Sequence, residues 1–262
     1  MLKRLLLHPS IRDIPLGSPS YFNKQREVLF SKPLVKASYD LWYKLIREDV
    51  HTTPLLGEIL ELGSGSSYLK EFIPELLTSD VQEGIAEYVI DARELPFEEN
   101  SLRAICLTHV FHHIPDIHSF LSSATRCLKP GGVISLIDCA DTPLARFFFS
   151  HFHPEPYIRE ARDWNFTSCD AMLSANQALT GIVFKRDKKQ FFHEFPDLAI
   201  ETIEYLPSIG YLLQGGVTLR NCIPSFITPI IRALDKLTYI RPLISLHWHI
   251  RLRKKSHPAI SK

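Results

Sequence analysis

The stretch EILELGSGSSYLKEF, residues 58–72, decides the interpretation of this chain. An apolar run, Glu58–Leu62, leads into a loop of glycine and serine and then into a segment with helical spacing. Gly63 and Gly65 allow unusual backbone conformations and lack the Cβ atom that would hold a ligand away from the backbone. In an open α/β sheet the first strand-to-helix turn is the floor of the ligand site. The stretch therefore predicts a ligand-binding turn, although an ordinary tight turn explains two glycines alone equally well.

Length and composition suit one medium-sized domain with an appendage, or two small domains. The chain has 262 residues, of which 45% are hydrophobic, enough for a substantial core. Its five cysteines are odd in number, include no CxxC pair and mostly lie in apolar runs, which favours a reducing, cytoplasmic compartment. The N-terminal apolar stretch is too short for a secretory signal, and no run is long enough for a membrane-spanning helix. We expect a cytoplasmic protein that is soluble or bound peripherally to a membrane surface.

Charge is distributed unevenly along the chain. Residues 1–47 carry nine Lys/Arg and three Asp/Glu, and residues 232–262 carry eight and one, so the middle is acidic. Basic ends can bind an anionic partner such as a lipid headgroup surface, although solvated helix faces would explain the same charges. The acidic middle argues against nucleic-acid binding, which needs a basic stripe across the binding face. We therefore expect no nucleic-acid partner.

Short apolar runs alternate with helical patterns between residues 57 and 139, which is typical of βαβ units and a parallel sheet. Helical spacing also marks residues 1–56 and the region after residue 225, where Pro242 separates two expected helices, the second of them basic. The expected strands are Glu58–Leu62, Leu76–Asp80, Glu87–Asp91, Arg103–Val110, Val133–Cys139 and Leu198–Leu206, and the expected helices of the central region are Ser67–Ile73, Asp116–Leu128 and Asp187–Phe195.

Two nucleotide cofactors compete for the glycine loop. A nicotinamide dinucleotide favours GxGxxG or GxGxxA, with a small third residue that lets helix and strand pack closely beneath the pyrophosphate. The third position here is Tyr68, which is bulky and counts against a pyrophosphate. S-adenosylmethionine has no phosphate and tolerates a different loop.

Further motifs follow the loop in order: LTSD ending at Asp80, EYVIDARELPF containing Asp91, SLRAICLTHVFHHIPD, and ATRCLKPGGVISLID. Together with the loop they resemble the class I S-adenosylmethionine-dependent methyltransferases, in particular the large group typified by methyltransferase type 11 domains. The resemblance is close over residues 55–140. It implies an α/β, Rossmann-like fold whose seven-stranded, mostly parallel sheet has helices on both faces, here with helical N- and C-terminal extensions. The expected division is a methyltransferase domain at residues 1–216, with an insertion near 141–180, and a basic helical extension at residues 217–262.

The resemblance also assigns a cofactor site, with S-adenosylmethionine as the ligand. Its methionine end would be lined by the glycine loop, its ribose would meet Asp80, and its adenine would meet Asp91 and Ala92. The third glycine of the family loop is replaced by Ser67, whose hydroxyl can cap a free amide at a helix start, and we expect weaker rather than absent binding. The expected cofactor residues are Glu61, Gly63, Ser64, Gly65, Asp80, Asp91, Ala92 and His109.

Methyl transfer from a sulfonium needs alignment and a water-poor site, with a base only if the acceptor must lose a proton. His109 and His112, at the end of the fourth strand, are candidate bases because histidine titrates near neutrality. Asp138, at the end of the fifth strand, is a candidate for shaping the acceptor pocket. Packing or cofactor contact explains the same residues, so the catalytic roles of His109, His112 and Asp138 are hypotheses.

Five histidines, His109, His112, His113, His151 and His153, could converge with Glu155 to bind a metal. No cysteine pair accompanies them, and the adjacent His112 and His113 are expected to point to different sides, so no metal is predicted.

The acceptor is expected to be a small molecule or lipid-like. Phe147, Phe148 and Phe149 either form core or line an apolar mouth, and the basic tail with Trp248 either packs on its own domain or lies on a membrane. A nicotinamide oxidoreductase, a catalytically silent cofactor-binding protein and a membrane-surface protein with an inherited fold remain alternatives.

Overall fold

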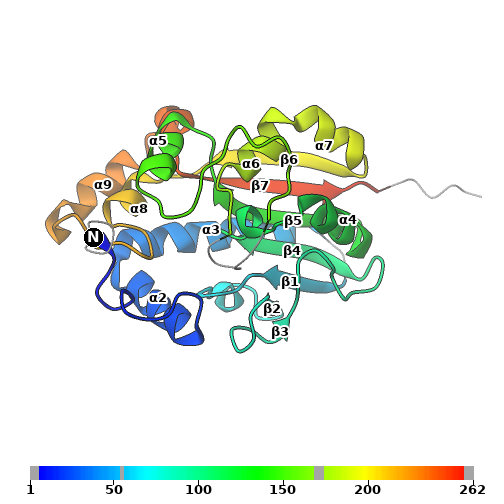
Figure 1. Cartoon of the computed structure of the whole chain (residues 1–262), viewed down its shortest axis with the longest axis horizontal. Coiled ribbons are helices and arrows are strands. Elements are labelled where there is room, and N and C mark those ends of the chain that lie inside the picture. Colours follow the sequence, from blue (N-terminus) through cyan, green and yellow to red (C-terminus); the bar gives the residue numbers. More distant parts are fainter. Residues whose placement is uncertain (1–5, 54–55, 168–173, 257–262) are drawn as a thin grey trace, which may run out of the picture.

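The computed structural model describes residues 6–53, 56–167 and 174–256, and its centre is a seven-stranded sheet (Figure 1). The strand order is β3-β2-β1-β4-β5-β7-β6. All neighbouring strands are parallel except that β7 is antiparallel to both β5 and β6. The strands are β1 (Glu58–Leu62), β2 (Leu77–Asp80), β3 (Tyr88–Val89), β4 (Leu102–Thr108), β5 (Leu128–Cys139), β6 (Leu198–Tyr205) and β7 (His247–Lys254).

The sheet is buried on both faces because alternate residues of its central strands face opposite layers. In β4, Ile105 and Leu107 join one hydrophobic cluster, whereas Ala104 and Cys106 join the other. Near-continuous apolar runs are what a parallel sheet covered on both sides requires. The expectation of a Rossmann-like sheet with helices on both faces is confirmed.

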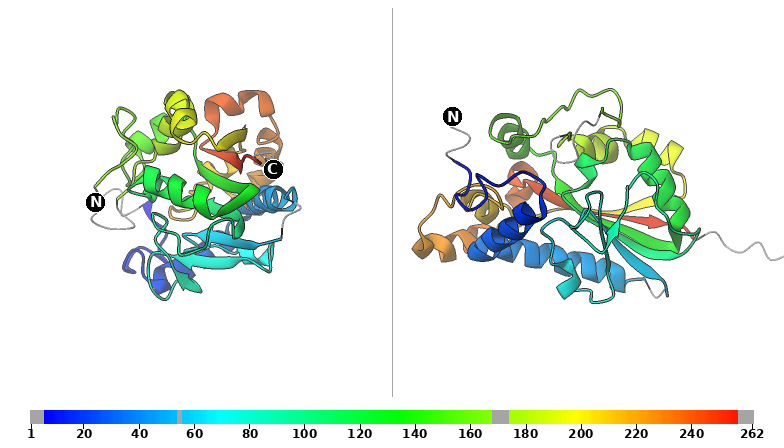
Figure 2. Two further views of the ribbon diagram at one scale, coloured as in Figure 1. Left: turned by 90° about the vertical axis from the view of Figure 1, so that its right-hand side faces the viewer. Right: turned by 60° about the horizontal axis from the view of Figure 1, so that its bottom comes forward.

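Helices from different parts of the chain form the two outer layers (Figure 2). One face packs against α3 (Pro33–His51), whose Trp42, Tyr43 and Ile46 are fully buried, as the helical spacing predicted. The other face packs against α4 (Ile117–Cys127) and the region of α6 (Leu179–Gly181), the π-helical turn η3 (Ile182–Arg186) and α7 (Lys188–Glu194). Helix α2 (Pro19–Ser31) begins at the cap residue Ser18, whose hydroxyl accepts a hydrogen bond from the amide of Tyr21.

The tail beyond Pro242 differs from the sequence-based expectation. Helices α9 (Thr228–Leu234) and α10 (Arg241–Ile244) form in the expected helical region, with a turn and a 3₁₀ segment between them. Pro242 was expected to separate two helices, but it lies in the first turn of α10, and the expected second, basic helix is strand β7. Its arginines pair with carboxylates from distant segments. Nη1 of Arg251 lies 2.8 Å from Oδ1 of Asp49, and Nε of Arg253 lies 2.5 Å from Oε1 of Glu201. The sheet thus continues past residue 216, because β7 pairs with β5 and β6, and the division of the chain at residue 216 stays a prediction.

Two other expectations are corrected in detail. The segment Ser67–Ile73 forms only a short 3₁₀ turn, η1 (Leu69–Glu71), and the third strand is limited to Tyr88–Val89. The expected insertion near 141–180 contains helix α5 (Pro143–His151), while its residues 168–173, including Cys169, lie outside the described residues. The remaining elements are η2 (Phe111–His113), α8 (Ile209–Leu213), η4 (Ser225–Ile227) and η5 (Thr238–Ile240). Within the described part, no helix is long and apolar enough to cross a membrane.

Candidate functional site

A cavity of about 350 Å³ lies where the parallel strands end. Its walls include the residues that directly follow β1, β2, β3 and β4, and Cys139 at the end of β5. This is the position at which open α/β sheets bind ligands. The sequence-predicted cofactor residues that line it are Gly63, Ser64, Gly65, Asp80, Asp91, Ala92 and His109.

The glycine loop needs its two glycines for conformation and for space. Gly63 has φ +64° and Gly65 has φ +45°, in the left-handed region that favours glycine. A Cβ atom on Gly63 would lie 2.5 Å from Cγ2 of Val110, and one on Gly65 would lie 3.1 Å from Cε1 of Phe22. The loop is also tied to the second strand, because the amide of Ser64 donates to the carbonyl of Ser79. The backbone that faces the cavity is therefore rigidly placed.

Glu61 lies beneath the loop and does not line the cavity. Its carboxylate accepts hydrogen bonds from Ser64 Oγ at 2.8 Å and Ser67 Oγ at 2.6 Å. Burial raises the pKa of Glu61, and the two serine hydroxyls only partly offset this, so that it reaches about 7. In this structure Glu61 fixes the loop from below.

Ser67, which replaces the third family glycine, is fully hydrogen-bonded. Its hydroxyl donates to Glu61 and accepts from the amide of Leu69 at 3.0 Å and from Tyr43 OH at 3.1 Å. The expectation that this hydroxyl caps a free amide is confirmed. The substitution is thus built into the loop rather than obstructing it.

Two carboxylates border the part of the cavity next to the glycine loop, which we call the cofactor half. Asp80, at the end of β2, is 6% exposed and accepts from the amides of Gly65 and Gln82, each at 3.1 Å. Asp91 follows β3 and pairs with the guanidinium of Arg93, with 2.6 Å between Oδ2 and Nη2. This pairing lowers the pKa of Asp91, so both its oxygens are charged acceptors at neutral pH.

His109 follows β4 with φ +59°, and its amide donates to the carbonyl of Ile137. Its ring packs among aromatic rings, 5.2 Å from Trp42 and 4.7 Å from His247 between centroids. Burial lowers the pKa of His109 to about 4, so the ring is neutral near pH 7. Its position facing the cavity agrees with the sequence-based expectation, while its catalytic role stays a prediction.

His112 stands between two carboxylates. Its Nδ1 lies 2.6 Å from Oδ1 of Asp138, and its Nε2 lies 3.3 Å from Oε2 of Glu155. Burial by itself lowers the pKa of His112, but Asp138 and Glu155 raise it to about 10. Asp138 is fully buried behind the ring, so it acts on the cavity through His112. Sequence analysis named His112 and Asp138 separately, and the structure joins them through this contact.

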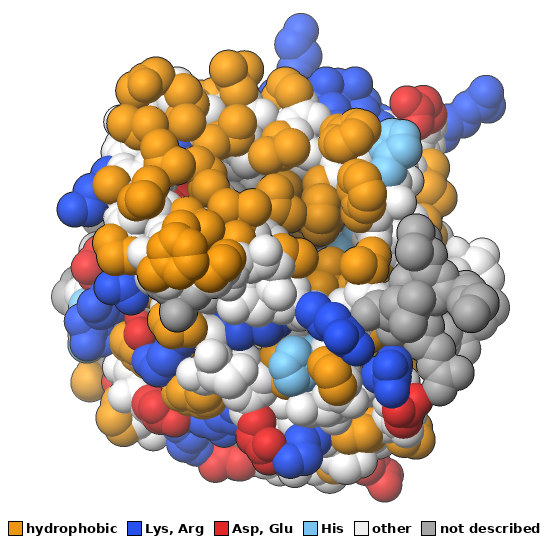
Figure 3. Space-filling view, turned by 90° about the vertical axis from the view of Figure 1, so that its left-hand side faces the viewer, with side chains coloured by type: hydrophobic (Ala, Val, Ile, Leu, Met, Phe, Trp, Pro, Cys, Tyr) orange, Lys and Arg blue, Asp and Glu red, His pale blue; other side chains and the backbone are white. Residues whose placement is uncertain are grey.

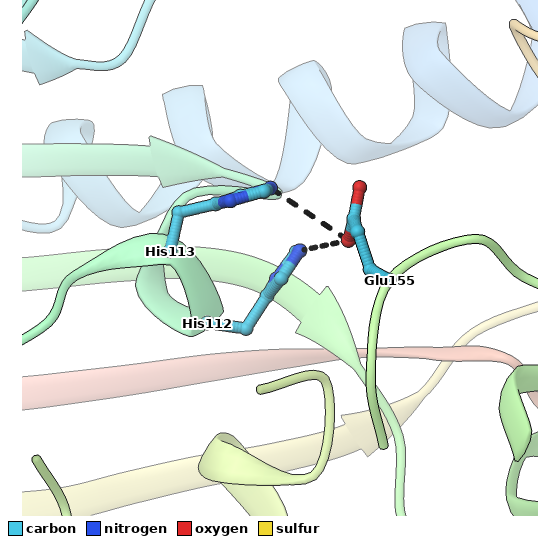
Figure 4. Close-up of side chains that lie close together, drawn as sticks. All are labelled: His112, His113 and Glu155. Atoms are coloured by element: carbon cyan, nitrogen blue, oxygen red, sulfur yellow. Dashed lines mark ion pairs between the residues drawn. The ribbon is translucent and has the colours of Figure 1, made fainter. Parts of the chain in front are cut away.

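His113 was expected to point away from His112, and this is wrong. The two rings lie 4.3 Å apart between centroids, and Nε2 of His113 lies 3.8 Å from the same Glu155 oxygen (Figure 4). Glu155 reaches the histidines from the segment after α5 and also accepts from Nε2 of Gln177 at 2.8 Å. In the sequence analysis Glu155 appears only as a possible metal ligand. No spacing in the sequence links it to Gln177.

Unpaired polar atoms test whether a polar cofactor fits this cavity. Among the described residues, several buried side-chain atoms lack a hydrogen-bond partner, and four of these belong to residues that line the cavity: Thr108 Oγ1, His109 Nε2, Gln177 Oε1 and His247 Nδ1. A buried polar atom without a partner is costly. Together with the backbone exposed at Gly63 and Gly65, these atoms fit a ligand rich in hydroxyl, amino and carboxylate groups, as S-adenosylmethionine is.

Comparisons with known proteins agree with this geometry. The family model described as Methyltransferase domain matches residues 60–136. A ubiquinone/menaquinone biosynthesis C-methyltransferase, UbiE of Desulfotalea psychrophila, is 27% identical over 97 residues, which span 35% of this chain and 39% of that protein. The matched part is thus well under two-thirds of the relative's length.

Solved structures share the fold at low sequence identity. An S-adenosylmethionine-dependent methyltransferase of Thermotoga maritima aligns with a TM-score of 0.53 and 14% identity, over 90% of this chain and 98% of its own. Another, from Archaeoglobus fulgidus, aligns with a TM-score of 0.51 and 16% identity, over 83% and 95%.

The strand order, the glycine loop and the matched segment define the class. Residues 60–136 match the Methyltransferase domain family, and the chain shares the fold of class I S-adenosylmethionine-dependent methyltransferases, a class whose cofactor is S-adenosylmethionine.

Proposed function

We propose that this protein transfers the methyl group of S-adenosylmethionine to a small-molecule or lipid-like acceptor that has an apolar body and a polar end. One observation carries the proposal: a single cavity joins the glycine loop to a second half lined by histidines, Glu155 and phenylalanines. A cofactor bound at the loop and an acceptor in this second half, which we call the acceptor half, would then share one cavity. Alignment of this kind is the main contribution that methyl transfer asks of a protein.

In this proposal the cofactor half is divided as the family resemblance suggests. The backbone at Gly63, Ser64 and Gly65 faces the methionine end, with Glu61 holding the loop from below. Asp80 accepts hydrogen bonds from the ribose hydroxyls, and Asp91 with Ala92 meets the adenine. The carboxylate of Asp91 would be shared between the cofactor and Arg93, because the guanidinium already contacts both of its oxygens.

The bound cofactor supplies an activated methyl group on a sulfonium. The chain's own residues then orient the acceptor and keep water away. Asp138 fixes the ring of His112, which positions the polar end of the acceptor, and the unpaired Nε2 of His109 accepts a hydrogen bond from a bound molecule. If the acceptor must lose a proton, the neutral ring of His109 is the candidate that receives it, because the raised pKa of His112, about 10, means that this ring already carries its proton at pH 7.

An apolar acceptor is supported by the side chains around the second half. Phe148 and Phe149 of α5 line the cavity together with Leu212 and Leu246. Phe149 is buried and Phe147 is 55% exposed, so the three phenylalanines divide between core and surface. A lipid-like body would fit against this wall.

Peripheral membrane contact is the second part of the proposal. An exposed apolar surface covers the side of the molecule that carries α9 (Figure 3). Helix α10 packs against α5, and α9 packs against α8, which brings these segments together. We call this surface the apolar face; its residues are Phe147, Phe152, Phe226, Ile230, Leu234, Tyr239 and Leu243, all exposed. Arg232 and Lys236 are exposed beside it and would meet anionic headgroups.

The test is incubation of the purified protein with methyl-labelled S-adenosylmethionine and fractionated cell extract. Label in a lipid fraction would support the lipid-like acceptor, and label in a water-soluble fraction would support a small polar acceptor instead. Cofactor binding measured by calorimetry, without label in any fraction, would favour the catalytically silent alternative. Absence of cofactor binding would refute the proposal.

A further inference from the structure

The two adjacent histidines and Glu155 share an arrangement that methyl transfer does not require. Nε2 of His112 and Nε2 of His113 both face Oε2 of Glu155, at 3.3 Å and 3.8 Å (Figure 4). All three ligand-type atoms lie within 4.8 Å of one another. The residues come from η2 and from the segment after α5, so the convergence is made by the fold and not by local sequence.

These distances agree with coordination of a small divalent ion. Zinc binds nitrogen and carboxylate oxygen at about 2.0–2.1 Å, and ligand atoms at the corners of such a tetrahedron lie about 3.3 Å apart. The 3.3 Å and 3.8 Å separations require only small side-chain shifts to admit an ion among the three atoms.

Both histidines have the outer partner that ligating histidines normally have. Nδ1 of His112 lies 2.6 Å from the Asp138 carboxylate, and Nδ1 of His113 lies 3.3 Å from the carbonyl oxygen of Ser174. Such a partner holds Nδ1 protonated and leaves Nε2 free to bind a metal. Both Nε2 atoms then face the same Glu155 oxygen, and an ion that binds there takes the place of the Nε2 proton of His112, which is released.

We propose that His112, His113 and Glu155 bind a divalent transition-metal ion in the acceptor half of the cavity. Two imidazoles and one carboxylate suit zinc or iron(II), whereas Mg²⁺ and Ca²⁺ prefer oxygen ligands. All three residues line the cavity, so the remaining coordination positions face the space that holds the acceptor. A site with three protein ligands and an open position is the arrangement of catalytic rather than structural zinc.

A second grouping of potential ligands in the same region fits less well. His112, Asp138 and Cys139 also bring three such atoms together. However, the 2.6 Å between His112 Nδ1 and Asp138 Oδ1 is a hydrogen-bond distance, well short of the spacing between two ligands of one ion. Asp138 is therefore a positioning residue, which orients His112 from behind.

The ion gives the acceptor half a specific chemistry, and this step rests on the proposed function. An acceptor hydroxyl or enol oxygen bound at the open position would lose its proton more readily, because the positive ion stabilises the oxyanion. The proton would pass to Nε2 of His109, the oxygen would attack the methyl carbon, the carbon–sulfur bond would break, and its electron pair would stay on sulfur. The proposal thus favours acceptors whose attacking atom is an oxygen.

Metal content of purified protein without a histidine tag tests the site directly, in the absence of cofactor and acceptor. We expect about one zinc or iron ion per chain by inductively coupled plasma mass spectrometry. We also expect stripped protein titrated with Co²⁺ to show the visible absorption bands of a bound ion. Glu155→Gln and His113→Asn should each weaken Co²⁺ binding at least about tenfold, and Asp138→Asn should weaken it about 10–100-fold through His112.

His118→Asn is the matched control. His118 pairs with Glu194 at 2.8 Å, also as a histidine beside a glutamate, but neither residue lines the cavity. This variant should keep the metal content and Co²⁺ affinity of the unchanged protein. Zinc should raise the melting temperature of the unchanged protein and of this control, and should not raise it in folded Glu155→Gln or His113→Asn.

Two results would overturn the proposal. One is a metal content well below one ion per chain after zinc reconstitution. The other is a Co²⁺ affinity in Glu155→Gln and His113→Asn that equals that of the unchanged protein. Calorimetry with S-adenosylmethionine separates the two claims. The cofactor should still bind Glu155→Gln, because that residue lies in the acceptor half. A metal-binding protein that fails to bind the cofactor would refute the proposed function and leave the metal site standing.

Discussion

Gly63 and Val110 approach so closely that only glycine fits at position 63. A Cβ atom there would lie 2.5 Å from one methyl carbon of Val110 and 3.0 Å from the other. Val110 directly follows His109, so the turn after β1 and the turn after β4 are packed against each other at the floor of the cavity. The conformation of the cofactor loop therefore depends on a contact between two strand ends.

We expect Gly63→Ala to abolish measurable cofactor binding and to lower the free energy of unfolding by about 2–4 kcal/mol, from left-handed strain and overpacking. Gly84→Ala is the control, because Gly84 also has a positive φ, +75°, but its added Cβ would meet only Pro19 at 3.7 Å. Chemical denaturation and calorimetry measure both effects. Equal losses in the two variants would contradict the role given to Val110.

Glu61 should make stability depend on pH near neutrality. Its pKa in the folded protein is raised to about 7 by burial, above the ordinary value of 4.5. The folded state therefore holds the proton more tightly, and this contribution is fully present below about pH 4.5 and lost as pH rises through about 7. We expect Glu61→Gln to remove a decline of up to about 3 kcal/mol over that range. Parallel denaturation curves with the same pH slope in both proteins would rule this out.

Asp49 should stabilise the junction of α3 with β5 and β7. It is 2% exposed and lies 2.7 Å from Nε2 of His249 and 2.8 Å from Nη1 of Arg251. Burial by itself raises the pKa of Asp49, but the hydrogen bonds from its partners lower it below the ordinary value. This stabilisation is present above the pKa of the unfolded chain and is lost as pH falls through the lowered pKa.

We therefore expect Asp49→Asn to cost about 3–5 kcal/mol at pH 7, as for a broken buried ion pair, and to weaken the loss of stability in acid. Glu27→Gln, which breaks the exposed pair with Lys24, is the control and should cost under about 1 kcal/mol. Thermal unfolding from pH 3 to 8 distinguishes the two. A loss of stability in Asp49→Asn as small as that in Glu27→Gln would show that the contacts of Asp49 with His249 and Arg251 contribute little.

Asp91→Ala should weaken S-adenosylmethionine binding by about 1–3 kcal/mol if the carboxylate accepts a hydrogen bond from adenine. Arg93→Ala is the informative companion, because it frees the Asp91 carboxylate from its guanidinium partner while keeping the carboxylate in place. Calorimetry should show weaker binding in the first variant and preserved binding in the second. Unchanged affinity in Asp91→Ala would remove this residue from the cofactor site.

The apolar face should mediate binding to anionic lipid vesicles. Ile230 is 62% exposed and Leu243 is 58% exposed, and replacing both with glutamate should abolish cosedimentation by adding charge that anionic headgroups repel. Phe192→Glu on α7 is the control, because α7 lies on the opposite side of the molecule from α9 (Figure 1). Equal sedimentation of the unchanged protein, the double variant and Phe192→Glu would refute membrane contact through this face.

The parallel core could be predicted because its signals are local. A few neighbouring residues are enough to predict each feature. The run Glu58–Leu62 predicts a strand, the glycines after it predict a turn, and the proline and glycines after Lys129 predict the end of a helix. The strand at the end of the chain is not predicted, because its basic residues also suit the polar side of a helix. In β7, Trp248, Ile250 and Leu252 alternate with His249, Arg251 and Arg253 at a period of two, and that alternation is the signal for a strand.

The acceptor half could not be predicted because its residues meet only in three dimensions. His113 and Glu155 are separated by 42 positions, and their meeting depends on how the chain returns over the sheet after α5. His112 and Asp138 were both named from their positions at strand ends, yet their hydrogen bond depends on the adjacent placement of β4 and β5. Sequence placed side chains at the correct edge of the sheet but could not show which atoms face one another.

The antiparallel strand has a consequence for synthesis on the ribosome. Strand β7 lies between β5 and β6, and within the described ranges β6 pairs with no other strand. Until residue 254 has left the exit tunnel, β6 and the open edge of β5 both expose unpaired backbone. We therefore expect nascent chains stalled before β7 to be held by chaperones, and the last step of folding to be insertion of a strand into a waiting gap.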